Sequence, residues 1–149
     1  MTRTTKAALG FLGAFALLQL VRFEQANPPV TADLVAPAEV TAILRRACYD
    51  CHSNETRWPW YGQVAPVSWL LHRDVVDGRK HLNFSDWSAA AEDRRARRRT
   101  AIVEEVSEGE MPPWFYVAAH PAARLSANDI QILRAWAGPG GDERPSDRP

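Results

Sequence analysis

Two cysteines, the only ones in 149 residues, lie within the five-residue stretch 48–52, which reads Cys-Tyr-Asp-Cys-His. Thiols this close cannot cross-link distant parts of a chain, so a disulfide scaffold is excluded and the pair must form a local site. A packed hydrophobic core must then stabilise the fold. With 46% hydrophobic and 24% charged residues, the chain can pack one. Its length allows one globular domain, hardly two.

The balance of charge gives no sign of a nucleic-acid partner, because 18 basic residues match 18 acidic ones. One charge run stands out: five arginines within residues 94–99, followed by four glutamates within residues 104–110. We expect a solvated helix face there. The alternative is a basic patch that docks an acidic redox partner or anionic lipid.

The amino terminus has the layout of an export sequence. Arg3 and Lys6 precede an uncharged run of 15 residues, 7–21, which Arg22 ends. As a helix the run covers roughly 22 Å, whereas a full membrane span needs about 20 residues. Because no good cleavage site follows, we expect residues 1–22 to be an uncleaved single-pass signal anchor in the inner membrane. A cleaved signal is the main alternative and a buried core helix the lesser one.

Either exported form places the rest of the chain in the periplasm, since the basic flank stays inside. The breaker Asn-Pro-Pro at residues 27–29 indicates a linker over residues 23–37. The last residues, 138–149, are rich in Gly, Pro and charge and are expected to be disordered. Residues 38–137 remain as the folded unit.

Apolar residues within the folded unit recur at helical spacing. This pattern predicts helices over residues 38–47, 65–78 and 89–107 and from Ser126 to Gly138. Gly78 and Gly109 are expected helix ends. Ser126 with Asp129 resembles a capping box. No segment alternates with a period of two, so the predicted class is all-α.

The pattern Cys-x-x-Cys-His is the attachment site of c-type haem. Two thiols three residues apart at a helix end, Cys48 and Cys51, can each form a thioether with one porphyrin vinyl group. The next residue, His52, is then held under the iron as the proximal ligand. Export agrees with this interpretation, because bacteria attach haem covalently outside the cytoplasmic membrane. The sequence therefore predicts one covalent haem c per chain.

Two other interpretations of the cysteine pair are weaker. A thioredoxin-like redox pair follows a strand, whereas a predicted helix precedes this one. A structural zinc site needs four Cys or His ligands, and the spare histidines His72, His81 and His120 have no finger-like spacing.

The sixth position of the iron has several candidate ligands: Met111, His72, His81 and His120. Met111 is the only methionine after the first residue and lies in a rigid stretch followed by two prolines. A thioether there raises the reduction potential, as suits an electron carrier, so Met111 is the preferred ligand. The alternatives are a methionine that only packs on the porphyrin edge and a histidine ligand, which lowers the potential.

Several segments in a fixed order resemble the haem-binding domain family of small bacterial single-haem c-type proteins. They are Cys48–Thr56, Trp58–Tyr61, Ala65–Trp69, Gly78–Trp87, Gly109–Pro113 and a final helix that Leu125-Ser126 opens and that contains Trp136. The resemblance implies an all-helical, cytochrome c-like domain around one covalent haem. It implies attachment at Cys48 and Cys51 and axial ligation by His52 and Met111. The aromatic residues Trp58, Trp60, Tyr61 and Trp69 are expected to line the pocket.

The leading functional hypothesis is outer-sphere electron transfer to redox partner proteins, membrane oxidoreductases in particular, by a carrier that is not an enzyme. The sequence contains no titratable dyad, nucleophile–base pair or phosphate loop. A second hypothesis is a gas or redox sensor or a small peroxidase whose sixth ligand is labile. A third is a haem-carrying module of a larger membrane complex.

Overall fold

Every regular element in the computed structural model is a helix within residues 2–138, the part of the chain that the structure describes. The α-helices are α1 Arg3–Leu18, α2 Ala38–Ala47, α3 Tyr49–His52, α4 Val67–His81, α5 Glu92–Glu108, α6 Trp114–Ala119 and α7 Ala127–Ala137. The 3₁₀ helices are η1 Trp60–Gln63, η2 Phe84–Ala89 and η3 Pro121–Ala123. The predicted all-α class is confirmed. The tail expected to be disordered lies outside the described residues from residue 139 onward.

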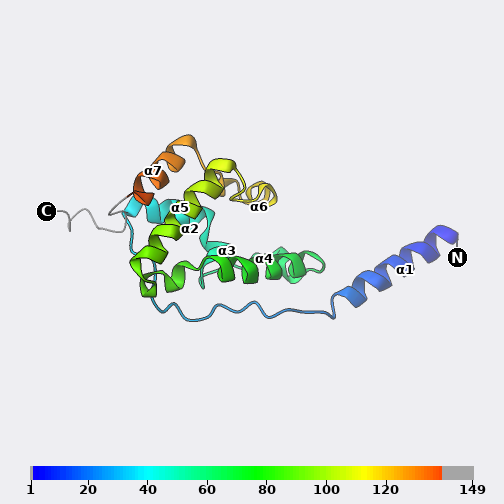
Figure 1. The fold of residues 1–149 in the computed structure, drawn as a ribbon. Helices are drawn as coiled ribbons and strands as arrows, with labels where there is room; N and C mark the ends of the chain where they lie inside the picture. Colours follow the sequence, from blue (N-terminus) through cyan, green and yellow to red (C-terminus); the bar gives the residue numbers. More distant parts are fainter. Residues whose placement is uncertain (1, 139–149) are drawn as a thin grey trace.

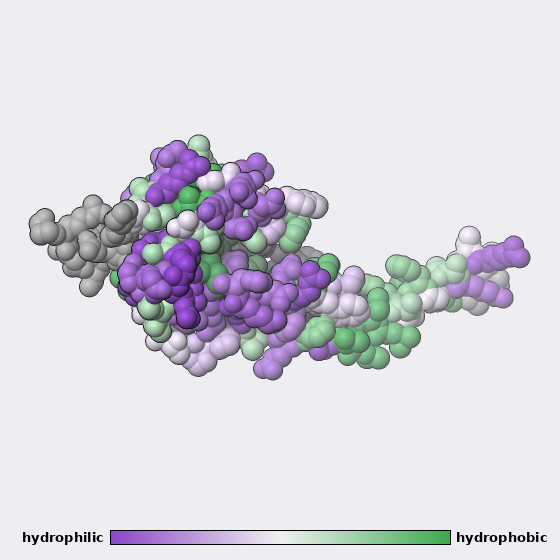
Figure 2. All heavy atoms as spheres, in the orientation of Figure 1, coloured by the Kyte–Doolittle hydropathy of each residue, from purple (hydrophilic) through white to green (hydrophobic). Residues whose placement is uncertain are grey.

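Helix α1 stands apart from the body of the molecule, and an extended segment joins the two (Figure 1). Thr2 caps this helix, because its side chain accepts a hydrogen bond from the backbone N–H of Thr5 at 3.2 Å. None of its residues is buried, and Figure 2 shows a largely apolar surface over it. Within residues 2–138, no helix combines the length and the apolar character needed to cross a membrane. The structure therefore gives the expected membrane anchor no support.

The segment between α1 and α2, residues 20–37, runs extended along the body, and we call it the strap (Figure 1). It is bonded to the body throughout much of its length. The backbone N–H groups of Thr31 and Ala32 donate to the Ser85 carbonyl at 3.2 and 3.0 Å. Leu34 is buried in the core. The residues expected to be a linker are therefore part of the packed domain.

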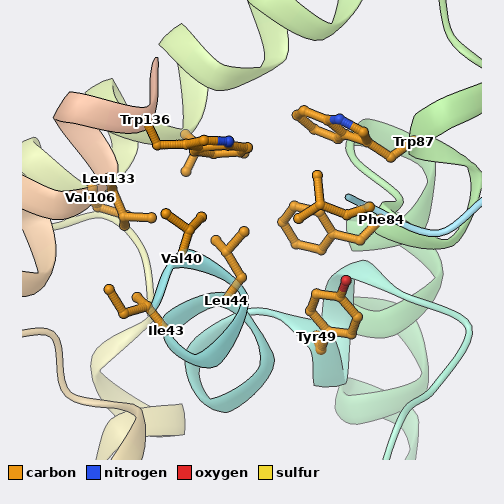
Figure 3. Close-up of a cluster of buried hydrophobic side chains, with 11 residues drawn as sticks. Val40, Ile43, Leu44, Tyr49, Phe84, Trp87, Val106, Leu133 and Trp136 are labelled. Carbon is orange, nitrogen blue, oxygen red and sulfur yellow. The ribbon is translucent and has the colours of Figure 1, made fainter. Parts of the chain in front are cut away.

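The core lies where α2, α5 and α7 meet η2 (Figure 3). Helix α2 buries the face that its spacing predicts, which consists of Val40, Ile43, Leu44 and Ala47. Beside it lies a series of aromatic rings. Tyr49 stacks on Phe84 with centroids 5.0 Å apart, and Trp87 contacts both Phe84 and Trp136 at 5.8 Å. Because Tyr49 lies between the two cysteines, this core fixes the cysteine motif in place.

The expected helix ends are partly confirmed. Gly109 ends α5 with φ 78°, and Ser126 and Asp129 form a capping box. The prediction that Gly78 ends a helix is wrong, because α4 continues to His81. A Cβ atom on Gly78 would lie 2.7 Å from the Cys51 carbonyl oxygen. Glycine is therefore needed where α3 and α4 touch.

Candidate functional site

The motif at residues 48–52 forms a tight junction between α2 and α3. Cys48 ends α2 and precedes α3, and its carbonyl accepts the backbone N–H groups of Cys51 at 3.2 Å and His52 at 2.9 Å. Both thiols are free and half-buried. Burial raises the pKa of Cys48 to about 12 and that of Cys51 to about 11, so both are protonated at neutral pH.

The imidazole of His52 is held by the end of α4. Its Nδ1 lies 3.0 Å from the Gly78 carbonyl oxygen and 3.2 Å from that of Leu82. Because a carbonyl can only accept, Nδ1 carries the proton and Nε2 keeps its lone pair. Burial lowers the pKa of His52, which favours the neutral ring. This is the tautomer and the orienting hydrogen bond of a metal-ligating histidine.

Arg79 joins the segment after His52 to both α4 and the strap. Its guanidinium donates to the carbonyl oxygens of Ser53 at 2.7 Å and Ala26 at 2.9 Å. It also donates to Asn27 Oδ1 and Thr56 Oγ1, both at 2.9 Å. One planar group with several donors suits this role, which a lysine could not fill. The sequence pattern predicts no role for Arg79, because its partners lie up to 53 residues away.

A narrow cleft of about 10 Å³ opens beside Cys51, and Tyr61, Leu71, Tyr116 and His120 are among its lining residues. Two arms of the chain meet there. One is η1 with the start of α4, and the other is α6 with η3. The Tyr61 hydroxyl approaches His120 Nε2 at 3.3 Å, and this contact links the arms.

The second arm is also tied to the cysteine motif. The Tyr116 hydroxyl donates to Asp50 Oδ2 at 2.8 Å, and its ring stacks on His120 with centroids 4.4 Å apart. Burial, followed by the bond to Asp50, raises the pKa of Tyr116, so the hydroxyl keeps its proton. Asp50 therefore holds the arm close to the thiols.

Met111, the expected sixth ligand, follows the end of α5 and is 38% exposed. Its backbone N–H donates to the Glu105 carbonyl at 3.3 Å. It is not one of the residues that line the cleft beside Cys51. The structure thus brings Cys48, Cys51 and His52 together and adds His120, whose role the spacing of residues could not single out.

The aromatic residues expected around the pocket have different surroundings. Tyr61 lines the cleft. Trp69 donates its Nε1–H to the Val21 carbonyl at 2.9 Å and so binds the strap. Trp60 is 80% exposed. Trp58 buries an Nε1–H that has no hydrogen-bond partner among the residues the structure describes.

One of three comparisons with known proteins gives a match. The haem-binding domain family matches residues 13–138, which is well over half of the chain. No curated protein and no solved structure matches. The chain therefore belongs to the haem-binding domain family. The match begins within α1 and includes the whole strap, which packs on the domain.

The residues present fit a haem. Two free thiols and an imidazole with an uncommitted Nε2 are a donor set for thioether attachment and iron ligation. Large apolar rings stand exposed on both arms of the cleft, as a flat apolar group requires: Trp60 on one arm and Trp114 and Phe115 on the other. The Nε1–H of Trp58, which is buried without a hydrogen-bond partner in the described part of the chain, is a donor that a polar substituent can use.

Proposed function

We propose that this protein is a single-haem c-type electron carrier that works outside the cytoplasm. The observation that carries the proposal is the state of His52. Its Nδ1–H is bound by two carbonyls, and its Nε2 has no hydrogen-bond partner among residues 2–138, directly after two free thiols on the same junction. Membership of the haem-binding domain family supports the cofactor.

The two thiols are the groups that would attach the cofactor. Each S–H of Cys48 and Cys51 would add across one vinyl double bond of the porphyrin, so no atom would be lost and no oxidant would be needed. Bound in this way, the haem supplies an iron that alternates between the ferric and ferrous states. The chain fixes the imidazole of His52 through the Gly78 and Leu82 carbonyls and shields the site by burial.

Retention near membrane oxidoreductases in the periplasm is part of the same proposal. It rests on the basic and apolar amino terminus, whose side chains are exposed in α1. The exposed aromatic residues on the arms of the cleft suit the edge of a cofactor through which electrons reach a partner. Met111 remains the ligand that the sequence predicts for the sixth position.

The test is a reversible redox titration of the protein produced together with a haem-attachment system, followed by visible absorption. We expect one covalently bound haem that titrates as a single one-electron couple and exchanges electrons with a soluble acceptor. Reduced protein that binds carbon monoxide promptly would contradict the carrier and favour the sensor or peroxidase alternative. His52→Ala, with both cysteines intact, should keep the covalent haem and lose the native spectrum.

A further inference from the structure

His120 lies in the cleft beside Cys51, yet attachment and proximal ligation leave it without a role. Its ring contacts both arms: it stacks on Tyr116 at 4.4 Å and lies 6.2 Å from the Tyr61 ring. The bond from Tyr116 to Asp50 holds this pair against the cysteine motif. His120, 68 positions after the proximal histidine in the chain, thus lines the same cleft as Cys51, the residue directly before that histidine.

The hydrogen bonds of His120 define its tautomer. Nδ1 lies 3.2 Å from the Tyr116 carbonyl oxygen, which can only accept, so Nδ1 carries the proton. Nε2 then has a lone pair and accepts the hydroxyl of Tyr61 at 3.3 Å. A hydroxyl at this distance is a long partner that another group can displace. His120 therefore shares with His52 the arrangement of a metal-ligating imidazole, Nδ1–H on a carbonyl and Nε2 available.

Met111 has no comparable placement. It is 38% exposed and does not line the cleft, whereas His120 does. The preference for Met111 rested on its being the only methionine after the first residue, on the rigidity that Pro112 and Pro113 give its loop, and on the reduction potential that a thioether gives. A rigid loop can hold a ligand in place, but a side chain binds the iron only if it also lies at the site.

We propose that His120 supplies the sixth ligand of the haem iron through Nε2, so that the iron is held by two histidines. The proposal rests on the proposed function, because it presumes a haem attached at Cys48 and Cys51. Ligation by two histidines lowers the reduction potential relative to histidine with methionine. The carrier would then accept electrons from, and pass them to, low-potential partners.

The experiment compares absorption and electron paramagnetic resonance spectra of the full chain with covalent haem and of three variants. These are His120→Gly, Met111→Leu and, as a matched control, His81→Gln, whose side chain is exposed at the end of α4. We expect low-spin ferric iron in the unmutated protein and in Met111→Leu and His81→Gln. His120→Gly should become high-spin and bind carbon monoxide when reduced, and added imidazole should restore the low-spin spectrum.

Two results would overturn the proposal. One is a thioether–iron absorption band in the unmutated protein that Met111→Leu abolishes. The other is a His120→Gly variant that remains low-spin and does not bind carbon monoxide. Circular dichroism separates loss of a ligand from loss of the fold, and the imidazole rescue requires a folded site. Absence of covalent haem from the unmutated protein would instead contradict the proposed function, so the two failures are distinguishable.

Discussion

At the scale of single residues, the positions that shape the site are those where two backbones come close. Gly78 is such a position, because its carbonyl accepts the Nδ1–H of His52 and its Cα faces the Cys51 carbonyl. Arg79 follows directly and binds the chain after His52. The orientation of the imidazole therefore depends on two neighbouring residues of α4.

Gly78→Ala should destabilise the protein, because the added Cβ would lie 2.7 Å from the Cys51 carbonyl oxygen and neither backbone can yield freely. We expect a loss of about 1–3 kcal/mol in the free energy of unfolding. Denaturant unfolding measures it. Gly10→Ala is the control, since nothing lies within 4 Å of that position, and equal losses in the two variants would contradict the account.

Arg79→Lys should also destabilise the protein, since a single ammonium cannot replace a guanidinium that reaches four oxygen acceptors in Ser53, Ala26, Asn27 and Thr56. A loss of about 1–3 kcal/mol is expected from unsatisfied, partly buried acceptors. Lys80→Ala removes an exposed neighbour that pairs with Asp77 and should cost less than about 1 kcal/mol. Thermal unfolding that ranks the two variants in the opposite order would refute this role of Arg79.

At the scale of elements, α5 shows how a basic run is neutralised. Arg97 pairs with Asp93 and Arg98 with Asp86, and Glu92 accepts from both Arg95 and Arg99. The acids at the start of α5 also suit its dipole. The predicted solvated face is confirmed for Arg94 and Arg97, which are exposed, but not for Arg99, which is buried. The ion pairs weaken the alternative of a basic docking patch.

The ion pairs of Glu92 predict a pH dependence. Hydrogen bonds from Arg99 and then Arg95 hold the pKa of Glu92 below its ordinary value of 4.5. A depressed pKa stabilises the folded state above the unfolded value, and that stability is lost as the pH falls through the folded pKa. Glu92→Gln should therefore lower the melting temperature at pH 7. The difference in melting temperature between the variant and the unmutated protein should decrease as the pH falls below 4.5. A difference that stays constant with pH would contradict this prediction.

Sequence patterns over a few neighbouring residues predicted those features of the fold that such neighbours determine. The buried face of α2, the capping box of α7 and the glycine at the end of α5 all follow from residues a few positions apart. The strap left no such signal, since an extended segment has no helical period and its partners lie elsewhere in the chain. For the same reason the contact between Tyr61 and His120, 59 residues apart, could not be predicted.

At the scale of the whole molecule, the amino-terminal region consists of two parts, helix α1 and the strap, which differ in how they contact the body. Helix α1 buries nothing, whereas the strap adds Leu34 to the core and binds η2. The ring of Phe23 stacks on His72 of α4 at 4.7 Å. The packed domain therefore begins near residue 20 and not at residue 38.

Two truncations test this division. Removal of residues 1–18 should change the free energy of unfolding by less than about 0.5 kcal/mol, because no buried contact is lost. Removal of residues 1–36 should cost at least about 2 kcal/mol, because the Leu34 side chain leaves the core. Equal stability of the two shortened chains in denaturant would show that the strap is only a linker.

The central claim is that Cys48 and Cys51 carry one covalent haem. Its most direct test is the intact mass of the denatured protein after production with a haem-attachment system. The account predicts a single species heavier than the bare chain by one haem, and the bare mass when both cysteines are replaced by alanine. A bare mass for the unmutated chain, with haem released on denaturation or never bound, would contradict the account.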